Sequence, residues 1–140
     1  MRRYPNSTLL NIYSEPIIRA AIALQRDRPD QAIEFLNAMM PYEGGNAAFW
    51  PDYLRGQAYL RMRRGNEAAA EFQKILDHRG WDPPSPMFPL AHLGRARALS
   101  LAGDVTGSRK SYQDFFALWK DADSDLPVLI DARKQYEQLK

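Results

Sequence analysis

The chain has 140 residues, a length that suits one compact domain or a short stack of repeats. With 45% hydrophobic and 26% charged residues it has the composition of a soluble globular protein, which excludes a mostly disordered chain. The net charge of +2 gives no broad basic field for nucleic acid, and the absence of cysteine excludes disulfides and thiolate metal sites. No window has the roughly 18 uninterrupted apolar residues of a membrane span, so we expect a soluble domain without membrane insertion, cytoplasmic by default.

Apolar stretches with helical periodicity alternate along the chain with breaks marked by glycine or proline. In chain order, the predicted helices cover residues 17–25, 30–39, 51–63, 67–78, 86–102, 106–120 and 127–139. No segment has the strict alternation or the density of β-branched residues that is typical of a strand, so the predicted class is all-α. Several of the ten prolines fall near helix starts, whereas Pro16 and Pro89 predict a kink or a late beginning of their helices.

The predicted helices form similar pairs, which suggests a repeat. The second helix of each pair has a small residue followed four positions later by a large one: Ala32 and Leu36, Ala68 and Phe72, Ser108 and Tyr112. The first helices carry a small residue twelve positions earlier, at Ala20, Gly56 and Ala96. Two helices that cross closely need a small residue on each at the contact, so we expect these residues to meet within each pair.

On these residues the chain resembles the tetratricopeptide repeat family, with the best match at Gly56, Tyr59, Ala68 and Phe72. The resemblance implies a single domain over residues 1–140, built as an α-solenoid of about three helix-turn-helix repeats plus a C-terminal capping helix. The implied boundaries are residues 8–40, 49–79 and 86–120 for the repeats and 126–139 for the capping helix.

The chain departs from the family pattern in its spacing and in its turns. The extra residues fall in the loops 42–50 and 79–85 between the predicted repeats. Of the glycines that the family carries between its paired helices, only Gly103 is matched. Asp27 stands there in the first repeat, and Arg63 in the second, where Gly65 could take over the turn.

A narrower resemblance is carried by the runs 53–59, 71–80 and 118–123. They are similar to the C-terminal tetratricopeptide regions of bacterial eukaryotic-like serine/threonine kinases, and to the tails of some winged-helix transcriptional regulators. The resemblance implies that the chain is a regulatory tail excised from a longer protein. Kinases of this type often carry a membrane span, so the resemblance permits either side of a membrane for such a tail.

The sequence offers no constellation of catalytic, metal-binding or cofactor-binding residues. It lacks a Gly-rich phosphate loop, and the order of residues 77–79 is wrong for a kinase catalytic loop. We interpret His78 as a residue that ends a helix and His92 as a packed or capping histidine. The acidic run Asp121, Asp123 and Asp125 lacks the glycine and glutamate of a calcium loop and is interpreted as carboxylates that cap the last helix. We therefore expect a non-enzymatic chain without a cofactor.

Arginine supplies most of the positive charge, and its densest cluster is Arg61, Arg63 and Arg64, with Arg55 shortly before it. A nucleic-acid site needs a broader basic surface than this cluster provides. We interpret the cluster as a solvated turn.

What remains is a surface, because the first helices of a solenoid line its concave side. The residues expected to line a partner-binding groove are Gln25, Trp50, Tyr53, Gln57, Arg61 and Arg97, with Ile17, Ala21, Leu60, Leu93 and Leu101 beside them. Their mixture of aromatic, apolar and hydrogen-bonding groups suits a protein or peptide partner. Two alternatives stay open. Trp50 and Tyr53 could simply cover a neighbouring loop or helix, or the repeats could form a homo-oligomer through an exposed end that carries Leu9, Leu10 and Ile12.

Overall fold

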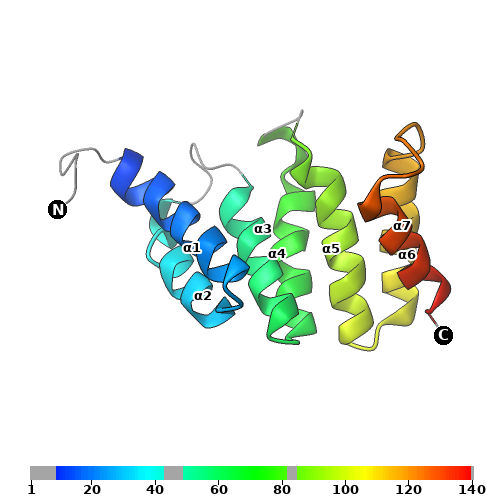
Figure 1. Ribbon diagram of the computed structural model, residues 1–140, viewed down its shortest axis with the longest axis horizontal. Helices are drawn as coiled ribbons and strands as arrows, with labels where there is room; N and C mark the ends of the chain where they lie inside the picture. Colours follow the sequence, from blue (N-terminus) through cyan, green and yellow to red (C-terminus); the bar gives the residue numbers. More distant parts are fainter. Residues whose placement is uncertain (1–8, 43–48, 82–84, 140) are drawn as a thin grey trace.

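The computed structural model describes residues 9–42, 49–81 and 85–139 (Figure 1). These residues are all-α, with seven α-helices and no strand among them. The α-helices are α1 (Glu15–Gln25), α2 (Pro29–Asn37), α3 (Trp50–Arg61), α4 (Gly65–Asp77), α5 (Met87–Leu101), α6 (Val105–Leu118) and α7 (Pro127–Glu137). A π-helical segment (Leu9–Ser14) precedes α1, and short 3-10 turns (Met40–Tyr42 and Arg79–Trp81) follow α2 and α4.

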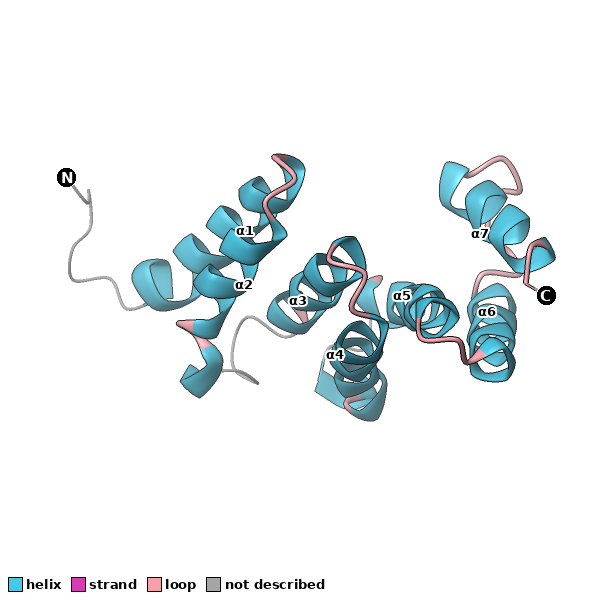
Figure 2. Ribbon diagram, turned by 90° about the horizontal axis from the view of Figure 1, so that it is seen from below, coloured by secondary structure: helices cyan, strands magenta, loops and turns pink. Residues whose placement is uncertain are grey.

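The helices stack side by side in chain order, so that each pair contacts the next, as in a solenoid (Figure 1). Figure 2 shows α1, α3, α5 and α7 along the inner side of a shallow arc, and α2, α4 and α6 along its outer side. None of the described helices is long and apolar enough to cross a lipid bilayer.

The three turns within the helix pairs have the same backbone geometry. Each has one residue with positive φ: Asp27 (55°), Arg63 (58°) and Gly103 (84°), which lie 36 and 40 residues apart. In each turn the next residue donates its N–H to a carbonyl near the end of the first helix, at Ala23, Tyr59 and Leu99. This is the left-handed helix ending that normally favours glycine.

Gly65 does not take over the second turn, contrary to one prediction from the sequence. It is the first residue of α4 and is buried against α5. A Cβ atom there would lie 2.7 Å from the Ala98 carbonyl oxygen and 2.7 Å from the Ala102 nitrogen. The glycine is therefore needed for close approach between helix pairs, and Arg63 itself adopts the left-handed conformation.

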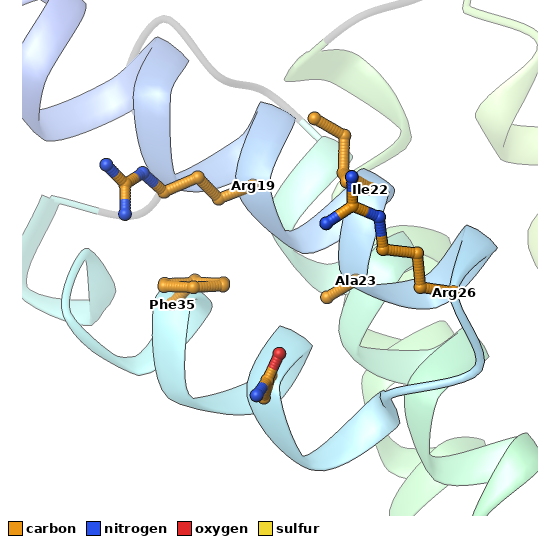
Figure 3. Close-up of a pocket in the computed structure, with 6 residues that line it drawn as sticks. Arg19, Ile22, Ala23, Arg26 and Phe35 are labelled. Atoms are coloured by element: carbon orange, nitrogen blue, oxygen red, sulfur yellow. The ribbon is translucent and has the colours of Figure 1, made fainter.

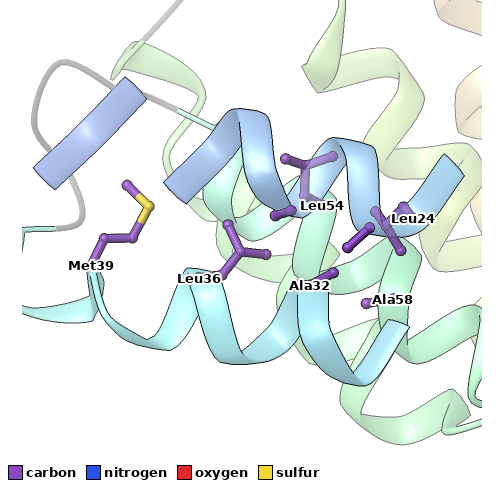
Figure 4. Packing of buried hydrophobic residues seen from close by; sticks show 8 residues of the cluster. Leu24, Ala32, Leu36, Met39, Leu54 and Ala58 are labelled. Carbon is purple, nitrogen blue, oxygen red and sulfur yellow. The ribbon is translucent and has the colours of Figure 1, made fainter. Parts of the chain in front are cut away.

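The core follows the predicted small and large positions. Ala20, Ala32, Ala68, Ala96 and Ser108 are fully buried, as are Leu36 and Phe72. The Ser108 hydroxyl donates to the Ala96 carbonyl oxygen at 2.7 Å, so the predicted contact of small residues in the third pair is confirmed. Figure 4 shows the first cluster, in which side chains of α1 and α2 gather around Leu54 and Ala58 of α3.

Phe72 connects three helices through two glycines. A Cβ atom at Gly56 of α3 would lie 2.7 Å from the Phe72 ring, and one at Gly94 of α5 would lie 2.5 Å from it. The ring therefore occupies space that both glycines leave open, which allows α3, α4 and α5 to approach one another closely.

Arg55 is buried, and does not belong to a solvated turn. Its guanidinium group lies 3.2 Å from a Glu71 carboxylate oxygen of α4 and 3.5 Å from an Asp52 carboxylate oxygen. It also donates to the Leu36 carbonyl oxygen of α2 at 3.3 Å. One arginine thus ties the second helix pair to the first, and the two carboxylates compensate its charge.

Five of the prolines in the described residues lie near the beginnings of α-helices. Pro29 and Pro127 are the first residues of α2 and α7, and Pro16, Pro51 and Pro89 also lie in first turns. The N–H groups of a first turn have no partner within the helix, so Pro89 requires no kink. Pro16 differs, because the π-helical segment Leu9–Ser14 runs directly into α1 and Ser14 is itself in the helical region (φ −72°, ψ −43°). This proline therefore follows a change of helix type instead of a free helix start.

Candidate functional site

Three of the residues predicted to line the groove meet between α3 and α5 on the inner side of the arc. Gln57 forms a hydrogen bond with the hydroxyl of Tyr53, one helical turn away on α3. Arg97 of α5 lies close enough to Tyr53 for its charge to act on the phenol. Together with Tyr112 of α6 and Gln135 of α7, these residues form what we call the Tyr53–Arg97 cluster.

Arg97 holds this cluster to the last helix. Its Nε donates to the Gln135 Oε1 at 2.8 Å, and the Tyr112 hydroxyl donates to the same oxygen at 3.0 Å. The two donors and their shared acceptor come from three helices. The position of the arginine is therefore fixed before any partner binds, which lowers the ordering cost of binding.

The two tyrosines of the cluster are hydrogen-bonding groups rather than bases. Burial raises the pKa of Tyr53, while the charge of Arg97 and the hydrogen bond from Gln57 oppose the increase. Burial also raises the pKa of Tyr112, again against the influence of Arg97. Both phenols therefore remain protonated at neutral pH.

A hollow of about 310 Å³ adjoins the cluster between α5, α6 and α7. Its lining combines polar groups with the apolar side chains of two leucines, and consists of Arg97, Ser100, Leu101, Tyr112, Gln135, Gln138 and Leu139. Leu101 is exposed at its edge. The hollow can take an apolar side chain while the cluster hydrogen-bonds the neighbouring backbone of a ligand.

Trp50 and Tyr53 differ in their surroundings. Trp50 is 48% exposed at the start of α3, so about half of its surface is open to a partner. Tyr53 is half-buried and packs edge-on against Phe72, with 5.8 Å between the ring centroids. Tyr53 therefore helps to cover the core and also presents its hydroxyl to the Tyr53–Arg97 cluster.

The remaining groove residues are not brought together. Arg61 donates to the Leu24 carbonyl oxygen in the last turn of α1 and lies 3.8 Å from the Asp27 carboxylate. Gln25 is exposed at the end of α1. Leu93 is buried in the cluster of apolar side chains that α7 covers, because α7 lies beside α5 and removes it from the inner surface. Of the predicted self-association residues, Ile12 is half-buried, and the side chains of Leu9 and Leu10 lie outside the described residues.

Within the described ranges, no group of three His, Asp or Glu side chains is placed to hold a metal ion. His78 donates a hydrogen bond from Nδ1 to the Lys74 carbonyl oxygen at 2.7 Å, at the end of α4, as its position in the sequence suggests. His92 packs edge-on against Phe88, and burial lowers its pKa. The predicted capping by Asp125 and its neighbours is wrong, because α7 begins after Leu126 without a side-chain cap.

The sequence interpretation missed Gln135, which completes the cluster. One signal could have found it. Ala132 follows Ala96 by 36 residues, and it is fully buried like the small residues of the other first helices. That spacing would have aligned α7 with the first helices and placed its neighbours beside α5.

Comparison with models of known families, with curated proteins and with solved structures finds no match for this chain. The resemblance to tetratricopeptide proteins therefore stays a prediction. The fold and the geometry of the cluster are the observations on which a function can be based.

Proposed function

We propose that this chain is a non-enzymatic protein-interaction module that binds a peptide or a partner helix along the inner side of its arc. The observation that carries the proposal is the Tyr53–Arg97 cluster, a set of preorganised hydrogen-bonding groups on an otherwise helical scaffold. Trp50 and Leu101 add exposed apolar surface on the same two helices. Aromatic and arginine side chains contribute a large share of the energy at such surfaces.

The chemistry of the cluster indicates the kind of ligand. Tyr53 and Arg97 are both donors at neutral pH, so they suit backbone carbonyls or a carboxylate on the ligand. The adjoining hollow suits one apolar side chain. An extended peptide with an apolar residue next to an acceptor group satisfies both requirements.

The resemblance of the sequence to the C-terminal regions of bacterial serine/threonine kinases supports a regulatory role for this binding. In that role the chain recruits a partner for the catalytic part of a longer protein. A tail of a winged-helix regulator is the alternative that the same resemblance leaves open. A module for self-association through an exposed repeat end is a second alternative, which rests on the apolar residues at that end and not on the resemblance.

Selection of peptides from a random display library against the whole chain tests the proposal. We expect the selected peptides to shift the NMR signals of α3 and α5, and the double variant Tyr53→Phe with Arg97→Gln to lose their binding. The matched control is Tyr59→Phe with Arg64→Gln, another tyrosine–arginine pair, whose ring and guanidinium lie 5.1 Å apart at the α3–α4 turn. Equal binding by the two double variants would show that the cluster is not the site.

A further inference from the structure

α5 carries a second arginine on the side away from the Tyr53–Arg97 cluster. Arg95 precedes Arg97 by two residues, which separates the two side chains by about 200° around the helix. Arg95 is half-buried, and its Nη1 donates to the Ser111 hydroxyl oxygen of α6 at 2.7 Å. This is the single hydrogen bond of the Arg95 side chain within the described residues, so its other guanidinium N–H groups are available to a ligand.

Further positive charge surrounds Arg95. Arg79, in the 3-10 turn after α4, and Lys110 of α6 act electrostatically on the half-buried imidazole of His92, as does Arg95 itself. Among the described residues one carboxylate acts on the same imidazole, that of Asp114, which lies 4.0 Å from His92 Nδ1 and 2.7 Å from Lys110 Nζ. We call Arg79, His92, Arg95 and Lys110 the Arg95 cluster. Three cations and one carboxylate leave it with two positive charges in excess.

The same positions are neutralised in the second helix pair. Arg55 lies 3.5 Å from an Asp52 carboxylate oxygen and 3.2 Å from a Glu71 carboxylate oxygen. In the third pair, 40 residues later, the residues at the two carboxylate positions are His92 and Ser111. The arginine is therefore kept in the third pair while both of the carboxylates that would compensate it are replaced.

Even the exposed arginine of the first pair has a carboxylate partner. Arg19 pairs with Glu15 at 2.7 Å, and Figure 3 shows its guanidinium group above the ring of Phe35, with 5.6 Å to the centroid. Arg95 forms no ion pair within residues 9–42, 49–81 and 85–139, although it is half-buried. A charge that is partly removed from water is costly unless it is paired, so this position favours an anion from outside the chain.

The ring of Phe88 places Arg79 beside the imidazole. The Arg79 guanidinium group lies over this ring, with 5.0 Å between its Cζ and the centroid, and the ring packs edge-on against His92 at 5.3 Å between centroids. Arg79 is exposed and has no ion pair in the part of the chain that the structure describes. It therefore adds a second guanidinium group with unpaired charge to the Arg95 cluster.

His92 adds a hydrogen-bond donor instead of a charge. Burial lowers its pKa, Asp114 raises it, and the three cations lower it further. The imidazole is therefore neutral at neutral pH, and one of its two nitrogens donates. The Arg95 cluster thus combines cations and donors without an acceptor that needs a proton from a ligand.

We propose that the Arg95 cluster binds the phosphate group of a phosphorylated ligand, with the Arg95 guanidinium as the main contact. A phosphate monoester carries a charge of about −1.5 to −2 at neutral pH, which matches the excess of two positive charges better than the single charge of a carboxylate. The planar fork of a guanidinium also fits the oxygens of a phosphate. Because the cluster lies on the other side of α5 from Arg97, this proposal does not depend on the proposed groove.

Titration of phosphate compounds into the isotope-labelled whole chain is the test. The probes are inorganic phosphate and N-acetyl-phosphoserine amide, and the control is N-acetyl-serine amide at the same ionic strength. We expect both phosphate probes to give saturable shifts of the NMR signals of Arg95, His92 and Ser111, and the control to give none. Tighter binding of the phosphoserine compound would assign the site to a phosphorylated protein, and tighter binding of inorganic phosphate would assign it to a free anion.

Removal of the main contact should weaken binding. Arg95→Gln should raise the dissociation constant at least about tenfold. The matched control is Arg64→Gln, which makes the same change in net charge at an exposed arginine paired with Glu67, and it should leave the dissociation constant unchanged.

Two further variants change the charge of the cluster in opposite directions. His92→Asp supplies a carboxylate at the position of Asp52 and should weaken binding about tenfold. Asp114→Asn removes the one carboxylate and should tighten binding about threefold, whereas Asp131→Asn, at an exposed position of α7, should not change it. A gain in affinity cannot result from a loss of folding.

Three results would overturn the proposal. They are the absence of saturable binding by both phosphate probes, equal dissociation constants for Arg95→Gln and Arg64→Gln, and shifts centred on the Tyr53–Arg97 cluster. None of these bears on the peptide selection for the groove, so the two proposals can fail independently.

Discussion

Arg19 and Arg55 occupy the same position in consecutive helix pairs, yet one is exposed and the other is buried. Arg55 meets two carboxylates and a helix carbonyl in a covered interface. Arg19 has a local partner one turn away on α1 and an aromatic ring beside it. The difference teaches that the environment of this arginine is set by whether another helix pair covers it, and not by its own helix.

The largest expected effect is on this pair of arginines. Arg55→Ala should lower the free energy of unfolding by about 3 kcal/mol, because Glu71 and Asp52 would remain buried without their cation. Arg19→Ala should cost less than about 1 kcal/mol, since its ion pair is exposed. Urea unfolding of both variants, followed by circular dichroism, measures the difference. Equal losses would contradict the comparison.

The covered interfaces should also be sensitive to added volume. Gly94→Ala should destabilise the chain by about 1–3 kcal/mol, because its methyl group would overlap the Phe72 ring. Gly80→Ala is the control and should change stability by less than about 0.5 kcal/mol, since nothing lies within 4 Å of the added atom. Thermal unfolding of the two variants is the measurement, and a neutral Gly94→Ala would show that the interface can relax.

The turns should be interchangeable between pairs, unlike the faces. Arg63→Gly should stabilise the chain by up to about 1 kcal/mol, because it relieves a left-handed residue at some cost in backbone entropy. The opposite change, Gly103→Ala, should lose about 1 kcal/mol. A loss of stability on Arg63→Gly, measured by urea unfolding, would show that the Arg63 side chain contributes more than its backbone strain costs.

The smallest expected effect is the pH dependence of the third pair, where His92 occupies the position of Asp52. Burial lowers the pKa of His92, the nearby Asp114 raises it, and Arg95, Lys110 and Arg79 lower it. A histidine with a lowered pKa in the folded state gives stability that is complete above its unfolded pKa, about 6.5. That stability is lost as the pH falls through the lower folded value.

Comparing the chain with His92→Gln tests this sign. As the pH is lowered from 7.5 to 5, the free energy of unfolding of the parent should fall more than that of the His92→Gln variant. The extra loss is the stability that neutral His92 gives the folded parent. A constant difference over this range would show that His92 titrates alike in the folded and unfolded states.

The helix pairs could be predicted because their signals are local. The breaks between helices are marked by Gly103, Pro29 and Pro127. The points where paired helices cross are marked by small residues that lie twelve positions apart in the sequence. The predicted helices agree with α1 to α7 to within a few residues at most ends. The turn at Arg63 was harder to predict, because an arginine in the left-handed conformation has no signature in the sequence. The nearby Gly65 suggested that the left-handed residue of the turn lies two positions later.

The candidate site could be predicted only in part, since it depends on contacts between pairs. Tyr53, Gln57 and Arg97 were found because they share one side of the first helices. Arg61 was assigned to the groove by the same rule, but the Leu24 carbonyl lies within its reach. The burial of Arg55 depends on α2 and α4, which periodicity within α3 does not include.

The ring of Phe72 between Gly56 and Gly94 has a consequence for how related sequences can vary. The corresponding interface between the first two pairs has Leu36 and Leu54 in place of Phe72 and Gly94. Two side chains of medium size thus replace one large side chain and a glycine, which has no side chain. The volumes on the two sides of each interface are therefore coupled. Among homologues, we expect residues 72 and 94 to covary, with a larger side chain at one position accompanied by a smaller one at the other.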